Sequence, residues 1–433
     1  MSEIELQPAI TGLSGELEVP GDKSISHRAV IFSSLSEGTS TIDNFLTGED
    51  CFRTVEAFRQ MGVKIDEDGS RITVHGKGVQ ALTAPTQPIY FGNSGTTARL
   101  LSGVLAALPF FTTAYGDASL SKRPMDRVVV PLKEMGAVID GRESASLLPI
   151  AFSQATLTGV RHELTVRSAQ VKSALLLAGL LSNGKTTVVE KGVTRDHTEK
   201  LLPQYGVELS VSGSDITIEG GQHLTASDLK VPGDISSAAF FMVAAAITPN
   251  SQITIKNVGL NETRNGIVTA LLKMGAELTS TVHTYIGEEP VGDVTVASSS
   301  LHGITLEGEM IPNIIDEIPI LALAATQAEG TTVIKDAKEL RVKETDRIDA
   351  VVRNLRKMGA EIEAREDGMV IQGRQTLRGN VLDSFGDHRI GMMGAIASLI
   401  SDGKVVITDK DCINISYPPF FKHLESLQKK KTS

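Results

Sequence analysis

The sequence predicts a mixed α/β (α+β) protein of two similar domains, each built from three repeated units with helices packed inside and sheets facing outward. Three observations predict this inside-out α/β barrel: two phrases recur along the 433 residues, and a Val-Pro-Gly-Asp stretch occurs twice. Phrases that recur at long, similar intervals indicate internal repeats, and repeats decide the fold before any single element does.

The first phrase is a Met-Gly or Tyr-Gly pair that ends an amphipathic stretch. It occurs in FRQMGV, LKEMGA, PQYGV, LKMGAEL and LRKMGAEI, with Gly62, Gly136, Gly206, Gly275 and Gly359 spaced 69 to 84 residues apart. Glycine at this place predicts a helix C-terminal cap, because it adopts the left-handed conformation readily. The alternating residues that follow, such as those at 360–373, predict a β-hairpin.

The second phrase joins the end of a small-residue apolar helix to a strand rich in Thr, Val and Ile. Its copies are SSLSEGTSTI (33–42), LLSNGKTTVV (180–189), AAITPNSQITI (245–255), ATQAEGTTVI (325–334) and LISDGKVVIT (399–408), with a divergent copy in LAALPFFTTA (105–114). Together the two phrases predict six units of about seventy residues, each with two helices and several strands.

The repeated VPGD stretch, at 19–22 and 231–234, divides the six units into three plus three. This predicts two related domains joined by two crossings of the chain. A solenoid of stacked repeats is the alternative. Helices such as SALLLAGLL (173–181) are apolar on every face, which favours two domains because such helices lie buried inside a core.

Composition excludes several classes of function. The net charge is −10, Trp is absent and aromatic residues make up 4%, which disfavours a nucleic-acid or anionic-membrane surface. Two cysteines, Cys51 and Cys412, form no metal-ligand pattern and indicate a reducing compartment. The N-terminal MSEIELQPAI lacks the pattern of a signal peptide, and the apolar runs are too short to span a bilayer. We therefore expect a cytoplasmic protein that binds no nucleic acid and no membrane.

Charged and small residues gather at the predicted helix N-termini. The phrases are GDKSISHR, GNSGTTAR, SKRPMDR, RSAQVKS, TRDHTEK, GDISS, NETR, IIDEIP, RVKETDR and FGDHR. A helix N-terminus favours anions, so several directed at one cleft predict a site for phosphate or carboxylate groups. A single Lys or Arg in such a turn is ordinarily just solvated, but its recurrence in several units favours binding. His197 and His388 lack further ligands at metal-binding spacing, so we expect no metal.

In combination these phrases resemble the enolpyruvyl transferase family over essentially the whole chain. SAQVK, RDHTE and NETR are similar to the second bacterial subgroup of its shikimate-pathway branch. The resemblance implies two domains of three βαβαββ units each, with residues 1–20 joining 235–433 and the other domain comprising 21–234. It also implies an active site between domains that close on substrate.

The resemblance implies transfer of the enolpyruvyl group of phosphoenolpyruvate to the 5-hydroxyl of shikimate 3-phosphate, with release of phosphate. This is a step in aromatic amino acid biosynthesis, and we expect a monomer that uses small anionic substrates and no cofactor. Carried over motif by motif, the shikimate 3-phosphate ligands are Lys23, Ser24, Arg28, Ser168, Ala169, Gln170, Arg195, Asp316 and Lys343. The phosphoenolpyruvate ligands are Lys23, Gly95, Arg123, Gln170, Arg347 and Arg389.

The implied chemistry is addition followed by elimination, in which a hydroxyl loses a proton while the alkene carbon gains one. Asp316 is the candidate base on the hydroxyl, Glu344 the candidate for the methylene proton, and Lys23 a further acid. Fixed cations stabilise the developing charge in place of a metal. Ser416 stands where many family members have Lys, and Lys410 is the candidate substitute.

Two alternatives stay open. The sister transferase that acts on UDP-N-acetylglucosamine typically carries a reactive Cys in the loop that here reads LSKRPMDR, which supplies Arg123 and no Cys. The other alternative is a phosphate-binding scaffold of the same fold that does no catalysis. Retention of Asp316, Glu344 and Lys23 together argues against the scaffold.

Overall fold

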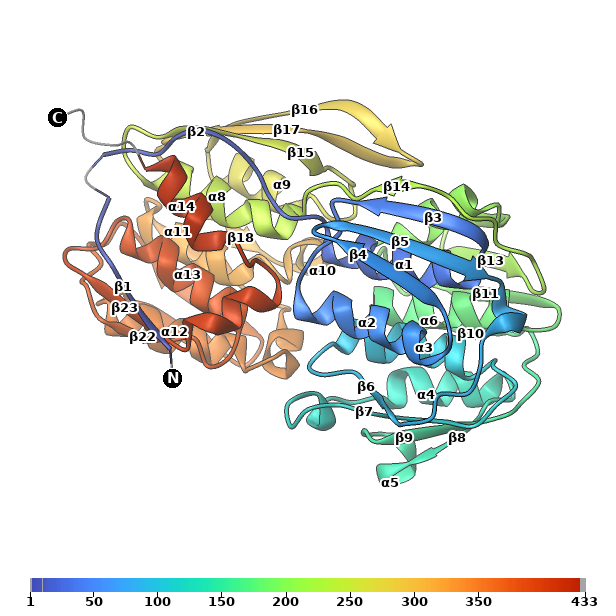
Figure 1. Ribbon diagram of the computed structural model, residues 1–433. Helices are drawn as coiled ribbons and strands as arrows, with labels where there is room; N and C mark the ends of the chain where they lie inside the picture. The colour runs from blue at the N-terminus through green and yellow to red at the C-terminus, as the bar shows by residue number, and fades with distance from the viewer. Residues whose placement is uncertain (1, 10, 429–433) are drawn as a thin grey trace. The chain divides into compact units, whose positions relative to one another are not determined.

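The computed structural model describes residues 2–9 and 11–428 and divides the chain into two compact units (Figure 1). The terminal unit comprises Met1–Pro20, Pro232–Tyr285 and Pro290–Ser433, and the central unit comprises Gly21–Val231 with Ile286–Glu289. Each unit has its own hydrophobic core. Within the described residues, no helix has the length and apolar character needed to cross a membrane.

The described residues of the central unit form three four-stranded sheets. In each, one edge strand runs parallel to its neighbour and the remaining pairs are antiparallel. The orders are β14 (Leu229–Lys230), β3 (Glu37–Asp43), β5 (Arg71–Lys77), β4 (Lys64–Asp68); β6 (Ile89–Tyr90), β7 (Thr112–Tyr115), β9 (Ile150–Ser153), β8 (Val138–Gly141); and β10 (Arg161–Glu163), β11 (Lys185–Val189), β13 (Asp215–Glu219), β12 (Leu209–Ser212).

The terminal unit repeats this pattern, and over its described residues it has two four-stranded sheets and one three-stranded sheet. Parallel pairs again occur, between β2 and β15, β18 and β19, and β22 and β23. The orders are β16 (Glu277–Ile286), β17 (Glu289–Ala297), β15 (Gln252–Gly259), β2 (Ser14–Glu18); β18 (Thr305–Leu306), β19 (Thr331–Ile334), β21 (Gly368–Gln372), β20 (Ile362–Arg365); and β1 (Glu3–Leu6), β23 (Val405–Thr408), β22 (Val381–Asp383).

The two VPGD stretches follow strands that have been exchanged between the units. Strand β2 precedes the first stretch but pairs in parallel with β15 of the terminal unit. Strand β14 precedes the second stretch but pairs in parallel with β3 of the central unit. The first sheet of the terminal unit therefore includes β2, which precedes the central unit in the sequence, and the first sheet of the central unit includes β14, which precedes the main part of the terminal unit. This exchange explains why the chain crosses between the units at both VPGD stretches.

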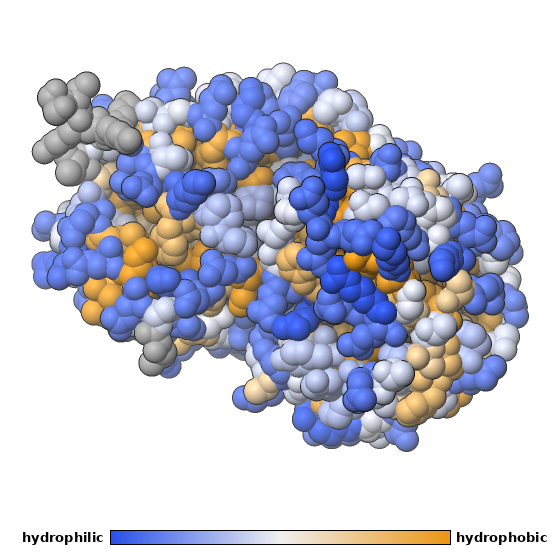
Figure 2. All heavy atoms as spheres, in the orientation of Figure 1, coloured by the Kyte–Doolittle hydropathy of each residue, from blue (hydrophilic) through white to orange (hydrophobic). Residues whose placement is uncertain are grey.

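The helices that begin with the charged phrases form the interior of each unit. They are α1 (Lys23–Leu35), α3 (Gly95–Leu105) and α6 (Ala169–Leu180) in the central unit, and α8 (Ile235–Ile247), α11 (Ile318–Gln327) and α13 (His388–Ser398) in the terminal unit. Small residues allow close packing: a Cβ on Gly103 of α3 would lie 2.1 Å from the carbonyl oxygen of Ala174 in α6. Hydrophilic residues predominate on the face shown in Figure 2, as expected when the apolar helices lie inside each unit.

A second set of helices is mostly amphipathic and ends each repeat's helical part. These are α2 (Glu49–Gln60), α4 (Asp126–Glu134), α7 (His197–Leu201), α9 (Gly266–Lys273), α12 (Arg347–Lys357) and α14 (Phe420–Leu427), with the short α5 (Arg142–Ala145) and α10 (Ile311–Ile314) between elements. The predicted α/β fold, with helices inside and sheets outside, is confirmed.

The predicted glycine caps are confirmed by the backbone conformation and hydrogen bonds at each glycine. At the end of α2, Gly62 has φ +90°, its N–H donates to Arg59 O, and the N–H of Val63 donates to Phe58 O. These paired bonds satisfy the last carbonyls of a helix in a Schellman motif. The same pair recurs at the other glycines of the phrase: Gly136, Gly206, Gly275 and Gly359. The hairpin predicted at 360–373 is the antiparallel pair β20 and β21.

Candidate active site

The predicted site residues of the central unit begin its buried helices. Lys23, Gly95 and Ala169 are the first residues of α1, α3 and α6. Each helix has a side-chain N-cap, supplied by Asp22, Ser94 and Ser168 respectively. Such caps satisfy some of the free backbone N–H groups and leave the others available to an anion.

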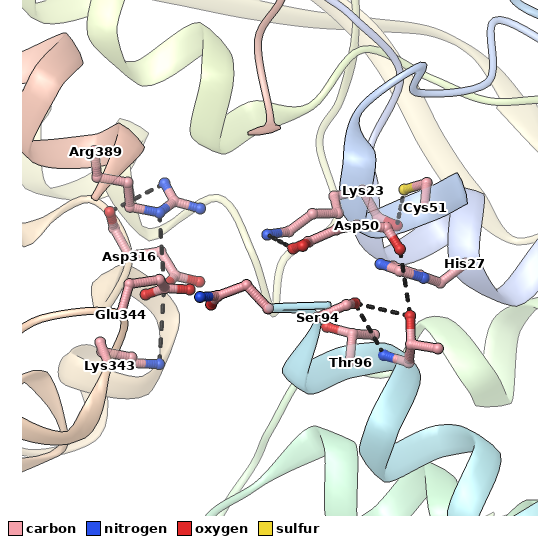
Figure 3. Close-up of polar contacts among 12 residues, drawn as sticks. Lys23, His27, Asp50, Cys51, Ser94, Thr96, Asp316, Lys343, Glu344 and Arg389 are labelled. Atoms are coloured by element: carbon pink, nitrogen blue, oxygen red, sulfur yellow. Dashed lines mark hydrogen bonds and ion pairs between the residues drawn. The ribbon is translucent and has the colours of Figure 1, made fainter. Parts of the chain in front are cut away.

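The Lys23 ammonium lies 3.2 Å from the carboxylate of Asp50 on α2 (Figure 3). Both side chains are partly exposed, at 18% and 11%. The Cys51 thiol donates to the backbone carbonyl of Lys23 at 3.8 Å. Helix α2 thus holds the start of α1 and orients its ammonium group.

Arg28 is a buried arginine, 3% exposed, that donates to neutral oxygens. Its Nε donates to Thr198 Oγ1 at 2.8 Å, its Nη1 to Ser24 O at 3.0 Å and its Nη2 to Ser173 Oγ at 2.6 Å. The Thr198 and Ser173 hydroxyls are themselves 2.7 Å apart. This network joins α1, α6 and α7 around one guanidinium group.

Burial lowers the pKa of Arg28 to about 10, against the opposing effect of the Glu199 carboxylate. The charge of Arg195 lowers the pKa further, so this predicted ligand lies in the same electrostatic environment. A buried cation that lacks a full counter-charge is costly, and a bound anion would offset that cost.

Gly95 lies beside two guanidinium groups. A Cβ at this position would be 3.1 Å from Arg99 Nη1 and 3.3 Å from Arg123 Nη1, which is tighter than ordinary contacts. Gln170 joins the starts of α3 and α6, because its Oε1 accepts from Arg99 Nη1 at 2.6 Å and its Nε2 donates to Thr96 Oγ1 at 3.0 Å. The sequence therefore brings Gln170, Gly95 and Arg123 together in one unit.

Arg123 is 8% exposed and is held mainly by Asn93 of the GNSGTTAR phrase. Its Nη1 donates to the Asn93 carbonyl at 3.4 Å, and its Nη2 donates to the Asn93 side-chain oxygen and to Ser119 Oγ. Asn93 in turn donates to Asp117 at 2.7 Å. These contacts with Asn93 and Ser119 hold the guanidinium group in place.

In the terminal unit, Arg347 lies among carboxylates and is 1% exposed. Its Nη1 donates to Asp316 at 3.2 Å, its Nη2 to Glu344 at 2.6 Å and its Nε to Asp387 at 2.8 Å. Burial acts to lower the pKa of Arg347, but the carboxylates, Asp387 above all, outweigh it, so the pKa is raised. One guanidinium therefore holds both predicted catalytic carboxylates, Asp316 and Glu344.

Asp316 is also approached by the other predicted cations of this unit (Figure 3). Lys343 Nζ and Arg389 Nε lie 3.8 Å and 3.9 Å from its Oδ1, and Arg389 Nη1 donates to its backbone carbonyl at 3.1 Å. The carboxylate is 14% exposed. The N-cap of α11 is Glu317, so Asp316 does not cap that helix.

Several partners of these residues were missed by sequence reasoning. Asn93, Arg99 and Asp387 lie inside phrases already singled out, so polar residues at fixed places in those phrases were an available signal. Asp50 lies outside every phrase, and its pairing with Lys23 depends on how α1 packs on α2. Lys410, the candidate substitute for a family lysine, pairs with its neighbour Asp411 at 2.7 Å.

Comparison with known proteins gives one consistent family. The family model described as EPSP synthase (3-phosphoshikimate 1-carboxyvinyltransferase) matches residues 8–424. A 3-phosphoshikimate 1-carboxyvinyltransferase of Oceanobacillus iheyensis is 54% identical, and one of Bacillus thuringiensis subsp. konkukian 53%, each over 99% of this chain and 100% of the relative. The structure of EPSP synthase from Acinetobacter baumannii, 41% identical, matches with a TM-score of 0.89 over 99% of this chain and 98% of that one. The chain belongs to the EPSP synthase (3-phosphoshikimate 1-carboxyvinyltransferase) family.

Proposed function

We propose that the chain transfers the enolpyruvyl group of phosphoenolpyruvate to the 5-hydroxyl of shikimate 3-phosphate and releases phosphate, a step of the shikimate pathway. The observation that carries this conclusion is the match of full-length relatives with that name to 99% of the chain. The charge distribution supports it, because both substrates carry a phosphate and a carboxylate. Within the described residues, the guanidinium group of Arg28 donates its hydrogen bonds to hydroxyl and carbonyl oxygens and to no carboxylate. None of the matched relatives named above acts on UDP-N-acetylglucosamine by name, so that alternative is not favoured.

The proposed ligands retain the assignment made from the motifs. Shikimate 3-phosphate is bound by Lys23, Ser24, Arg28, Ser168, Ala169, Gln170, Arg195, Asp316 and Lys343, and phosphoenolpyruvate by Lys23, Gly95, Arg123, Gln170, Arg347 and Arg389. The helix starts at Lys23, Gly95 and Ala169 support this, since each directs backbone N–H groups outward from its first turn.

The proposed reaction has two stages. In the addition, Asp316 takes the proton of the 5-hydroxyl, the oxygen bonds to C2 of phosphoenolpyruvate, and the methylene carbon gains a proton from Glu344, with Lys23 as a further acid. In the elimination, Glu344 takes a proton back from the new methyl group, the double bond re-forms, and the bond from C2 to the phosphate oxygen breaks as phosphate departs. The shared contact of Asp316 and Glu344 with Arg347 supports these roles, because it holds both carboxylates in fixed positions.

The remaining expectations complete the proposal. The domains 1–20 plus 235–433 and 21–234 bind the two anionic substrates, and the chain acts as a cytoplasmic monomer. Because the net charge of the chain is −10, small anions should bind only where cations gather locally. Cations do gather around Arg28, near Arg195, and around Asp316, near Arg347. Light scattering after size-exclusion chromatography tests the oligomeric state.

Phosphate release from phosphoenolpyruvate tests the function, with shikimate 3-phosphate and UDP-N-acetylglucosamine compared as acceptors. We expect release with shikimate 3-phosphate alone. Release with the nucleotide sugar would assign the chain to the sister activity. Tight binding of shikimate 3-phosphate without any release would identify a non-catalytic scaffold.

A further inference from the structure

Lys172 is a fully buried cation that the proposed reaction does not use. It lies in the first turn of α6, directly after Val171, and its side chain is 0% exposed. Its Nζ is 2.6 Å from Glu199 Oε1 and 2.9 Å from Glu190 Oε1. Removing these charges from water is costly, and an apolar residue in the same place would fill the core more cheaply. The charge therefore calls for an explanation other than packing.

The two carboxylates stand at opposite ends of one loop. Glu190 directly follows β11, and Glu199 lies within α7. Arg195, a proposed ligand of shikimate 3-phosphate, lies in the loop between them. One ammonium thus holds both ends of the segment that carries this arginine.

Thr194 extends the same anchor to the residue beside Arg195. Its backbone N–H donates to Glu190 Oε1 at 3.2 Å, and its hydroxyl donates to the same oxygen. Glu190 therefore contacts Lys172 on one side and the backbone next to Arg195 on the other. Thr194 is buried, at 5% exposed, so this arrangement is part of the core of the central unit.

The residues next to Lys172 and Glu199 hold the second arginine of the same proposed subsite. Ser173 follows Lys172, Thr198 precedes Glu199, and both hydroxyls accept from Arg28. The turns of α6 and α7 that the ion pair joins are thus the turns that orient Arg28. Burial raises the pKa of Glu199, and the nearby Lys172 ammonium opposes part of that rise.

We propose that Lys172 is a positioning residue for shikimate 3-phosphate. Through Glu190 and Glu199 it fixes the loop at 190–199, so that Arg195 and Arg28 present their charges in the arrangement that this substrate requires. The inference rests on the proposed function, which assigns both arginines to shikimate 3-phosphate. Of the phosphoenolpyruvate ligands proposed in this unit, Lys23, Gly95 and Arg123 lie outside α6 and α7. Gln170 lies in α6 but is proposed for both substrates, so the larger effect should fall on shikimate 3-phosphate.

The decisive variant removes all three charges together: Lys172→Met with Glu190→Gln and Glu199→Gln. It keeps the approximate shapes of the side chains and removes the ammonium together with both of its carboxylates, so none of the three is left as a buried charge without its partner. We expect the KM for shikimate 3-phosphate to rise about tenfold, while the KM for phosphoenolpyruvate and kcat stay within about twofold and the melting temperature stays close to wild type. Lys185→Met, at an exposed lysine of β11, is the matched control and should change neither KM.

A milder pair of variants tests the inference without disturbing the buried charges. Thr194→Val removes the hydroxyl bond to Glu190 and should raise the KM for shikimate 3-phosphate, whereas Thr194→Ser keeps that bond and should restore it. This rescue is not expected of a residue that only fills space. The pair decides the question if the triple variant fails to fold.

Equal rises in both KM values, or an unchanged KM for shikimate 3-phosphate in folded variants of an active enzyme, would overturn the positioning role alone. A wild-type chain that neither binds nor converts shikimate 3-phosphate would overturn the proposed function, and this inference with it. Calorimetric affinities measured beside the kinetics distinguish the two failures, because the first appears only in the variants.

Discussion

Arg28 of the central unit and Arg347 of the terminal unit are both buried arginines, but their surroundings differ in charge. Arg28 donates to hydroxyl and carbonyl oxygens, and its pKa is lowered to about 10, first by burial. Arg347 donates to Asp316, Glu344 and Asp387, and these carboxylates raise its pKa against the effect of burial. Two arginines of similar burial are therefore in opposite electrostatic states.

The difference indicates what each arginine is for. The charge on Arg28 is incompletely balanced by the protein, so an anionic ligand stabilises it, and it suits substrate binding. The charge on Arg347 is already balanced by carboxylates, so besides its proposed contact with phosphoenolpyruvate it holds Asp316 and Glu344 in place. On the proposed assignment, Arg28 of the central unit binds an anion, whereas Arg347 of the terminal unit also orders the carboxylates proposed for proton transfer.

The largest expected effect is on turnover, from Asp316→Asn. If Asp316 is the base, its loss should lower kcat by about 10²–10⁴-fold. Stability should change little, because the N-cap position of α11 is Glu317 and Arg347 keeps its contacts with Glu344 and Asp387. Steady-state kinetics and thermal melts measure both.

Asp411→Asn is the matched control for this variant, since Asp411 is an exposed carboxylate of the same unit paired with Lys410. It should keep full turnover. An Asp316→Asn enzyme with more than a tenth of the wild-type rate would move the base role to Glu344.

Arg347→Met should destabilise the free protein by about 3–5 kcal/mol, because it leaves buried carboxylates without their cation. Asp387 is the most affected, at 0% exposed. Urea unfolding of the ligand-free chain measures the loss. Arg353→Met, which breaks an exposed pair with Asp349 on the same helix, should stay within about 0.5 kcal/mol of wild type. If Arg347→Met lost no more stability than Arg353→Met, Arg347 would not be balanced by its carboxylates in the way that distinguishes it from Arg28.

Arg28→Met should change the free energy of unfolding of the free protein in the opposite direction to Arg347→Met. It removes a buried charge whose hydrogen-bond acceptors are all neutral oxygens, and the Thr198 and Ser173 hydroxyls can still bond to each other at 2.7 Å. The free energy of unfolding should therefore stay unchanged or rise, while shikimate 3-phosphate binding weakens by about 1.5–3 kcal/mol. Melting curves and calorimetry test this. A loss of stability like that expected for Arg347→Met would show that Arg28 is balanced by the protein after all.

The sequence predicted the fold well because the fold is a repeat. The glycine phrase encodes a local bond pattern, so the caps at Gly62 and its equivalents follow from a few adjacent residues. The exchange of β2 and β14 between units depends on pairing across the chain, and residues alone predicted the two crossings but not the partner strands.

The sequence allowed us to predict which residues of the candidate site carry charge, but not which groups surround each charge. The cations of GDKSISHR and RVKETDR were visible in their phrases. That Arg28 meets hydroxyl groups and Arg347 meets carboxylates depends on residues far away, such as Thr198, 170 positions from Arg28. Long-range packing decides that difference, and no local spacing reports it.

The smallest expected effect is a pH dependence of stability that comes from His27. This side chain lies beside Arg28 in α1, is fully buried, and its Nδ1 is 2.7 Å from Thr54 Oγ1. Burial lowers the pKa of His27 well below 6.5, and the charges of Lys23 and Arg28 lower it further. The folded state therefore keeps the imidazole neutral, while the unfolded chain takes up a proton near pH 6.5.

As the pH falls below 6.5, the unfolded state binds a proton that the folded state does not, so the free energy of unfolding falls by up to about 1.4 kcal/mol per pH unit. Other groups titrate in the same range, so His27→Asn, which removes this titration, isolates the contribution of His27. Between pH 6.5 and 5.5 the wild type should lose about 1 kcal/mol more stability than His27→Asn in urea unfolding. Arg28→Met should reduce the wild-type loss, because one of the two cations that depress the pKa of His27 is then absent. Equal slopes for the wild type and His27→Asn would mean that His27 takes up its proton in the folded state, and that burial and the neighbouring cations do not depress its pKa.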